Sequence, residues 1–214
     1  MASTINALTG SGGVATSADA SGVLDLQSGG TTIATVSSAG IALASGKTLT
    51  GDAISNGKIL QVVQTVKTDT ASIASANTNT FVDLPGMSVA ITPSATSSKI
   101  LVSFTVSLGT SSGSLHINLV RGSTNIAVGD AAGSRLVSTI NHRPASTPYG
   151  LSTTPLSYTF LDSPSTTSAT TYKLQGTMGA TYSSTFYVNR STSDTNADYG
   201  ARVTSTITVM EVAG

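Results

Sequence analysis

The ten residues KILVSFTVSL, from Lys99 to Leu108, establish the class of fold that this chain adopts. Apolar side chains recur at every second position, and small hydroxyl side chains stand between them. A period of two residues is typical of a β-strand that buries one face and exposes the other. The expected buried face consists of Ile100, Val102, Phe104, Val106 and Leu108, and the expected exposed face of Ser103, Thr105 and Ser107.

Short runs of the same kind continue on both sides of this strand. They are separated by residues that favour turns, such as Pro85-Gly86, and none of them shows a sustained helical period. About ten short strands with turns between them predict an all-β sandwich, and the jelly roll is the architecture that fits best. The further strands are expected at 58–66, 79–84, 87–91, 115–119, 125–128, 135–140, 156–161, 171–174, 184–189 and 201–212.

The chain divides into two unequal parts by composition. All ten aromatic residues lie between Phe81 and Tyr199, whereas the first 57 residues hold 10 of the 21 glycines. Residues 1–57 therefore cannot fill a core, and we expect an extended glycine-rich arm for assembly and attachment, ordered by wrapping on partner chains. A disordered tail is the alternative. Residues 58–214 are expected to form the β-sandwich head domain. The arm side chains expected to contact partners are Ile33, Val36, Ile41 and Leu43.

The composition excludes several classes of function. Ser and Thr make up 69 of the 214 residues, and 10 basic residues are matched by 10 acidic ones, so no basic field for nucleic acid exists. The lack of cysteine and the presence of only two histidines argue against a disulfide framework and a zinc centre. No apolar run approaches the ~20 residues of a membrane helix, and no secretion signal is visible. A nearly uncharged polar surface is typical of a protein that works inside an assembly.

Two motifs match the patterns of functional sites, but each is better interpreted as a turn. Gly109-Thr-Ser-Ser-Gly113 matches the G-x-S-x-G pattern of esterases, in which a helix must follow the serine. Here a strand is expected to follow, so a hairpin turn is favoured. Asp194, Asn196 and Asp198 place oxygen atoms at alternate positions, as calcium loops do. They are the candidate metal ligands, but the glycine comes one position late and Ser205 stands where a bidentate Glu is expected. An Asx-rich turn is therefore favoured, and no cofactor is predicted.

The histidines and tyrosines offer few further candidates. His116 lies within an alternating strand and His142 in a loop, and their spacing suggests neither a catalytic triad nor a metal site. We expect both to be polar residues of a surface or an interface. Tyr149 and Tyr182 stand among Pro, Gly, Ser and Thr, which makes them the candidates for an exposed loop that recognises a receptor sugar. Contacts between subunits would explain them equally well.

Several strings resemble structural proteins of tailed bacteriophages. The N-terminal strings are similar to the arms of fibre-like phage proteins, and the C-terminal ones to a β domain on virion proteins of marine and cyanobacterial phages. This resemblance implies a virion protein of the fibre or capsid-decoration type, a homotrimer, with no shared catalytic residues. The strings are Met1–Asn6, Leu26–Thr32 and Ser45–Gly51 in the first part, and Ser98–Val102, Leu119–Gly122, Leu161–Pro164, Thr171-Tyr172 and Ser205–Glu211 in the second.

Three hypotheses follow. The first is a homotrimeric capsid decoration or cement protein on the virion surface, assembled in the host cytoplasm. Its arm would bind the major capsid protein or other virion proteins. The arm is too short to form the shaft of a long fibre, because ~50 residues span at most ~170 Å. The second is a tail fibre or fibre tip that binds host surface glycan. The third, a glycan hydrolase, needs paired acids, and ten acidic residues with a single Glu leave few pairs, so no enzyme is predicted.

Overall fold

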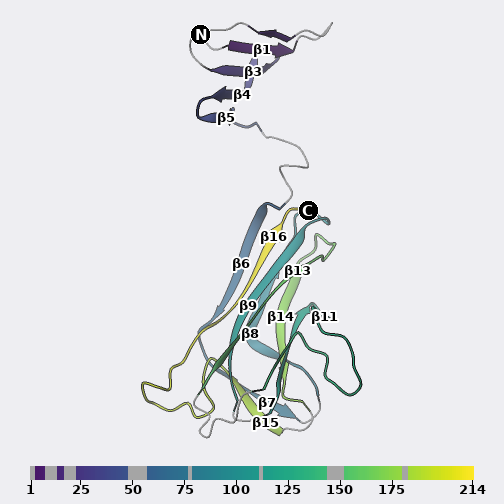
Figure 1. The fold of residues 1–214 in the computed structure, drawn as a ribbon, viewed down its shortest axis with the longest axis vertical. Coiled ribbons are helices and arrows are strands. Elements are labelled where there is room, and N and C mark those ends of the chain that lie inside the picture. Colours follow the sequence, from purple (N-terminus) through teal and green to yellow (C-terminus); the bar gives the residue numbers. More distant parts are fainter. Residues whose placement is uncertain are drawn as a thin grey trace. The chain divides into compact units, whose positions relative to one another are not determined.

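The computed structural model shows an all-β protein, as predicted (Figure 1). Within its described part, no helix has the length and apolarity needed to cross a membrane. The chain divides into two compact units, unit 1 from Met1 to Ser55 and unit 2 from Asn56 to Gly214. The residues that the structure describes are 3–7, 14–16, 23–47, 57–76, 79–110, 113–143, 152–179 and 183–214.

Unit 1 contains one five-stranded sheet. Its order is β2-β1-β3-β4-β5, in which β1 and β3 run parallel and the other neighbours antiparallel. Gly29 and Gly30 join β3 to β4 with φ values of 56° and 75°, the left-handed conformation that a two-residue hairpin turn requires. The strands are β1 (Ser3–Ala7), β2 (Val14–Thr16), β3 (Leu24–Ser28), β4 (Thr31–Ser37) and β5 (Gly40–Leu43).

This sheet differs from the extended arm that the sequence predicts. The Gly and Ser turns allow the short strands to fold back and pair within one chain. The sheet nevertheless buries little: across residues 23–47, Ala34 is the single buried side chain. Ile41 and Leu43 on the edge strand β5 are 70% and 40% exposed. The pairing is thus internal, while apolar surface is left uncovered.

Unit 2 is built from strand pairs that are nested like the two arms of one long hairpin. A long hairpin rolled on itself, so that distant pairs become neighbours, is the jelly-roll topology. From the outermost pair inward, the partners are β6 (Ile59–Lys67) with β16 (Ser205–Val212), β7 (Ala71–Ala76) with β15 (Ser183–Val188), β8 (Val82–Ile91) with β14 (Thr170–Thr177), β9 (Lys99–Gly109) with β13 (Thr154–Asp162), and β10 (Leu115–Arg121) with both β11 (Thr124–Ile126) and β12 (Ile140–His142).

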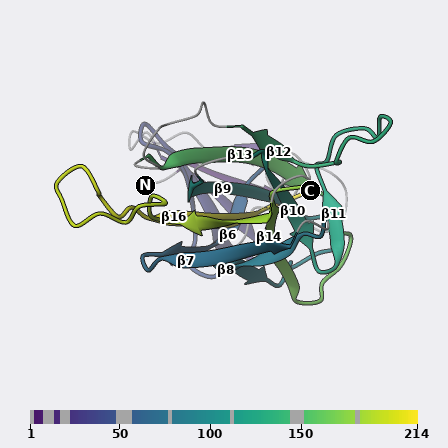
Figure 2. The same cartoon turned by 90° about the horizontal axis from the view of Figure 1, so that it is seen from below.

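Rolling the hairpin places these strands in two sheets. One sheet has the order β6-β16-β9, followed by β13 along most of β9 and by β15 and β7 at its end. The other has the order β11-β10-β14-β8, with β12 also beside β10. Figure 2 shows β13, β9, β16 and β6 side by side in the first sheet. The β-sandwich prediction is therefore confirmed.

The core lies between the two sheets. The predicted buried face of β9 is confirmed, because its five apolar side chains from Ile100 to Leu108 are at most 3% exposed. Both sheets contribute, and burying each such side chain contributes roughly 1.5–3 kcal/mol. The fully buried partners from the other strands include Leu115, Ile117, Leu119, Tyr172, Leu174, Phe186, Ile207 and Val209.

The structure corrects some of the predicted strand boundaries. Pro85-Gly86 does not end a strand, since β8 continues through both residues. β8 is the edge of its sheet, where the missing N–H of proline is tolerated, and its register with β14 shifts at this point. The predicted strand 135–140 is also wrong: only Ile140 belongs to a strand, the first residue of β12. Val203, expected within the last strand, precedes β16.

Candidate functional site

The outward face of the sheet β6-β16-β9-β13 is the most unusual surface of unit 2. Along β16, buried residues alternate with half-buried ones, so that Thr206, Thr208 and Met210 point away from the core. The strand registers align outward residues in rows across all four strands. One row consists of apolar side chains only, in the order Val62, Met210, Leu101 and Leu161.

The two neighbouring rows on this face consist largely of hydroxyl side chains that bond to one another. The first row is Gln64, Thr208, Ser103 and Thr159, and the second is Val66, Thr206, Thr105 and Ser157. The Gln64 amide donates to the Thr208 hydroxyl at 2.7 Å, and Thr159 donates to Ser103 at 3.2 Å. Thr105 and Ser157 share a hydrogen bond of 2.8 Å. These groups can therefore lose water at little cost.

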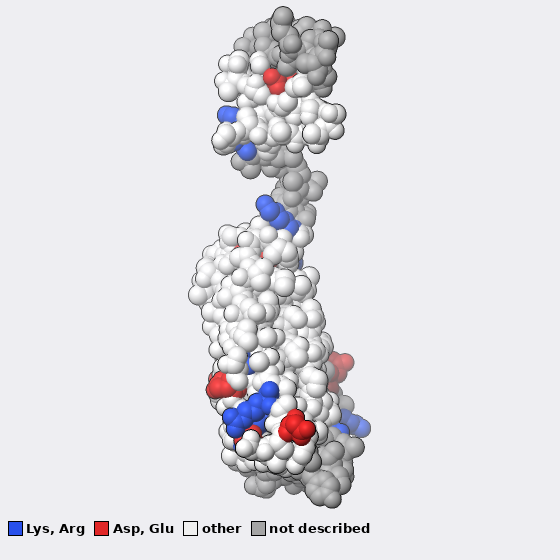
Figure 3. Space-filling view, turned by 90° about the vertical axis from the view of Figure 1, so that its left-hand side faces the viewer, with Lys and Arg blue, Asp and Glu red and all other residues white. Residues whose placement is uncertain are grey.

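None of the twelve side chains in these rows is charged. Lys99 stands at the end of the face, where its Nζ donates to Ser163 Oγ at 2.9 Å. Figure 3 views unit 2 from the side on which β6 lies in Figure 1, and much of the surface there carries no charged side chain. We call the twelve side chains the uncharged face. Such a surface is suited to being covered by another protein surface, since no charge has to be desolvated.

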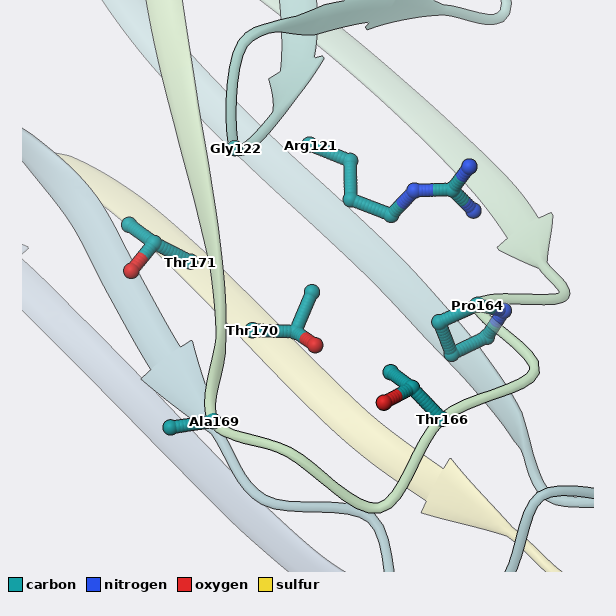
Figure 4. A pocket seen from close by; sticks show the side chains of 7 residues that line it. All are labelled: Arg121, Gly122, Pro164, Thr166, Ala169, Thr170 and Thr171. Atoms are coloured by element: carbon teal, nitrogen blue, oxygen red, sulfur yellow. The ribbon is translucent and has the colours of Figure 1, made fainter.

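A small pocket of about 310 Å³ opens where β10 and β13 end and β14 begins (Figure 4). It is an open site lined by one cation and several hydroxyl groups, with no acid–nucleophile pair among its lining residues. The loop that borders it includes Ser165, whose φ of 52° is unusual for a residue other than glycine. The lining residues are Arg121, Gly122, Pro164, Thr166, Ala169, Thr170 and Thr171.

Arg121 is held in place at this pocket by a buried acid. Its Nη1 lies 2.9 Å from each oxygen of Asp162, and the Tyr172 hydroxyl donates to Asp162 Oδ2 at 2.7 Å. Burial raises the pKa of Tyr172, and the hydrogen bond to Asp162 raises it further, so this phenol stays protonated. The trio joins three strands and is best explained as a clamp on the fold rather than as a catalytic group.

A second pocket, of about 380 Å³, contains the candidate metal ligands Asp194 and Asn196. Arg202 also lines it and bonds both carboxylate oxygens of Asp194, with Nε at 3.2 Å and Nη2 at 2.9 Å. The hydrogen bond from Arg202 lowers the pKa of Asp194. Asp198 accepts a bond from the backbone N–H of Tyr199 at 2.9 Å. Among the described residues, no cluster of three His, Asp or Glu side chains that could hold a metal ion is found.

The two histidines lie on neighbouring strands, but their side chains point to opposite faces of the sheet, because each is paired with a chain neighbour of the other. The pairing of β10 with β12 sets Leu115 opposite His142, and His116 opposite Asn141. His116 Nδ1 lies 3.4 Å from Ser138 Oγ, and burial lowers the pKa of this imidazole. The side-chain partners of His116 are Ser138 and Asn141, neither of which is an acid. The geometry thus gives no catalytic triad at these residues.

The other predicted site residues are distributed over both units. Ile33 and Val36 on β4 are half-buried, whereas Ile41 and Leu43 on β5 are exposed. Tyr149 and Tyr182, predicted to form a recognition loop, lie outside the described residues, as does Ser111 of the G-x-S-x-G motif.

Sequence reasoning missed the uncharged face, although one signal was present. Leu101 is an apolar residue on the side of the 99–108 strand that otherwise carries Ser and Thr. Val62 and Val66 repeat this exception on β6, where they are 56% and 51% exposed. An apolar side chain at an outward position of more than one strand is the pattern that would have predicted a contact surface.

Comparisons with known proteins give only distant likenesses. No family model and no curated protein matches the chain. Three similar solved structures come from infectious bursal disease virus, and this chain spans only about two fifths of the length of each. The TM-scores, all below 0.5, support no argument about function. The Gx strain structure has 12% identity, a TM-score of 0.38 and coverage of 80% of this chain and 42% of that chain. The VP2 subviral particle has 14% identity and a TM-score of 0.34, and the match covers 72% of this chain and 38% of that chain. The Gt strain structure has 13% identity and a TM-score of 0.35, and the match covers 81% of this chain and 42% of that chain.

Proposed function

We propose that this protein is a structural component of a tailed-bacteriophage virion, a homotrimeric decoration protein on the capsid surface. Unit 1 binds the major capsid protein, and unit 2 stands outward as a β knob. The observation that carries this proposal is the uncharged face of unit 2, a broad surface suited to burial in a chain of zero net charge. The resemblance of the chain to phage virion proteins agrees with it.

Unit 1 supplies the attachment in this proposal. β5 ends the sheet, so its outer backbone groups have no strand partner among the described residues, and an unpaired edge readily accepts another strand. Ile41 and Leu43 lie on this edge and are 70% and 40% exposed. Covering such side chains contributes roughly 1.5–3 kcal/mol each, and a trimer multiplies the gain by its three copies.

The mechanism is mechanical rather than chemical. A trimer bound across the joints between capsid subunits buries surface on several of them at once, and this raises the free energy needed to separate them. No proton transfer, covalent step or bound cofactor is part of this action.

The number of copies in each virion tests the proposal. Quantitative mass spectrometry of purified particles, with the major capsid protein as internal standard, should give hundreds of copies. Six or eighteen copies in each particle would place the protein on a tail and overturn the decoration role. A second readout is the loss of DNA from particles that lack the protein, which should occur at a lower temperature than from complete particles.

A receptor-binding fibre tip is the second candidate, and the pocket beside Arg121 favours it. Its Thr166 and Thr171 hydroxyls and the Arg121 guanidinium supply hydrogen-bond donors for a host surface glycan. The purified protein would then bind host cells and block phage adsorption, and Arg121→Met would weaken both. A protein that neither binds cells nor blocks adsorption would exclude this role.

A further inference from the structure

Three exposed aliphatic side chains lie in the rows of the uncharged face. Val62, Val66 and Leu161 are each more than half exposed, whereas Ile59, Leu60 and Val82, which lie outside the rows, are less than half exposed. Tyr199, at 61%, is an exposed aromatic side chain of unit 2 outside this face. Between Val62 and Leu161, the half-buried Met210 and Leu101 complete an apolar row across four strands. Scattered apolar side chains on a surface are ordinary, whereas a row of them aligned across four neighbouring strands marks a contact surface.

The size and polarity of the face suit a protein interface. Four strands about 4.8 Å apart, with three rows that cover some six residues at about 3.3 Å each, give an area of about 380 Å². A stable interface buries about 800 Å² on each partner, so this face supplies its centre and the neighbouring loops its rim. The hydroxyl groups of Thr105 and Ser157 already bond each other, which removes the main cost of excluding water.

The lack of charge on the uncharged face indicates which partner binds there. A partner with an ordinary charged surface would leave its charges desolvated against the face without an opposite charge to pair with. A second copy of this chain presents the same uncharged surface and avoids that cost. The two most exposed patches also lie at opposite edges of the face, Val62 and Val66 on β6 and Leu161 on β13. Unlike patches that join head to tail form a ring where the rotation between copies closes and a filament where it does not, whereas like patches form a two-fold dimer.

We propose that the uncharged face is the contact surface between three copies of this chain, in which Val62 of one copy packs against Leu161 of the next. This assignment rests on the proposed function for the number three. It adds the location of the contact, which the proposed function leaves open, and it places the apolar row around the three-fold axis.

The first test measures the mass of the full-length protein in solution by analytical ultracentrifugation. The wild-type chain should sediment as a trimer. Val62→Asp and Leu161→Asp should each raise the concentration for half-dissociation by roughly a hundredfold, because the contact would bury an unpaired carboxylate. Val82→Asp is the matched control, since Val82 is an exposed valine (38%) on β8, an edge strand of the other sheet. Its trimer should persist, and circular dichroism confirms that each variant folds.

The second test reads the contact directly, even if unit 1 alone holds the copies together. The chain has no cysteine, so introduced thiols are the only ones. Val62→Cys combined with Leu161→Cys should form disulfides between copies on mild oxidation, with covalent dimers and trimers on a denaturing gel. Val82→Cys combined with Leu161→Cys should leave the chains single.

The outcomes separate this inference from the proposed function. A wild-type monomer, or a trimer that resists both Asp variants and gives no crosslink through Val62 and Leu161, overturns the contact. The decoration role would still be judged by copies in each virion. Hundreds of copies together with an uncrosslinked trimer would keep the function and reject this face as the contact.

Discussion

Glu211 joins two distant parts of unit 2 through one carboxylate. It is 1% exposed, and its Oε1 accepts hydrogen bonds from Ser94 N, Ser94 Oγ and Ser98 Oγ at 2.6–2.7 Å. Its Oε2 accepts one from Gln61 Nε2 at 2.6 Å. Burial alone would raise the pKa of Glu211, but the bonds from Ser94, Gln61 and Ser98 outweigh it and lower the pKa to about 2.

This depressed pKa predicts a loss of stability in acid. The carboxylate stabilises the fold fully above the ordinary Glu pKa of 4.5, and its contribution disappears as the pH falls toward about 2. Glu211→Gln should lower the free energy of unfolding at pH 7 by roughly 2 kcal/mol and flatten its decline between pH 4.5 and 2. Urea unfolding across this pH range checks it. An unchanged acid profile in the variant would contradict the assignment.

The clamp at Asp162 predicts a difference between two ion pairs. Asp162 is 6% exposed, so Arg121→Met leaves a buried carboxylate with Tyr172 as its remaining strong partner, and we expect a loss of about 2–3 kcal/mol. Lys173→Met is the control, because the Lys173–Asp83 pair lies at the surface and contributes at most about 1 kcal/mol. Chemical denaturation of both variants measures the two losses. Equal losses of stability in the two variants would show that burying Asp162 does not strengthen its ion pair with Arg121.

For single residues, the sequence identifies an unusual side chain but does not predict its hydrogen-bond partners. Glu211 was recognised as the single Glu, yet its partners Ser94 and Gln61 lie 117 and 150 positions away. Only the rolled topology brings them together. The same holds for Arg121 and Asp162, 41 positions apart. They lie on β10 and β13, which belong to different sheets, so only the packing of the two sheets brings them into contact.

Among the elements, β9 determines the sandwich, and its end shows how closely the chain packs. A methyl group at Gly109 would run into the backbone carbonyl of Arg190, and rigid backbone cannot move aside as a side chain could. Gly109→Ala should therefore cost about 2–3 kcal/mol. Gly129→Ala is the control, because its nearest neighbour, the Ser138 carbonyl oxygen, would lie 3.9 Å away. Thermal unfolding of both variants measures the difference; a tolerated Gly109→Ala would show that this approach is loose.

Element prediction succeeded where the period of two was long and failed where turn residues dominated. Residues 99–108 and 205–212 carry the alternation over most of their length, with Leu101 and Met210 as apolar exceptions on the outward side, and both form strands of the core. Any rule based on local sequence predicts that a strand ends at Pro85-Gly86. The chain continues because β8 is an edge strand, and only the completed sheet determines which strands are edges.

For the whole molecule, the uneven composition predicted two parts but not the sheet within the first. The pairing of the strands between residues 24 and 43 depends on turns that the local sequence can indicate. How much of their apolar surface stays exposed depends on the partners that the protein meets in its assembly. Exposed Ile41 and the row through Val62 and Leu161 lie in separate units, and we propose a different partner for each. We therefore expect two independent contacts, one with the capsid and one between copies.

A cryo-EM map of the intact virion tests the central claim most directly. We predict three copies around each occupied three-fold position on the head, with the uncharged face of β6, β16, β9 and β13 turned toward the axis and unit 1 against the capsid. A map in which this face points into solvent, or in which the protein occurs only on the tail, would contradict the account.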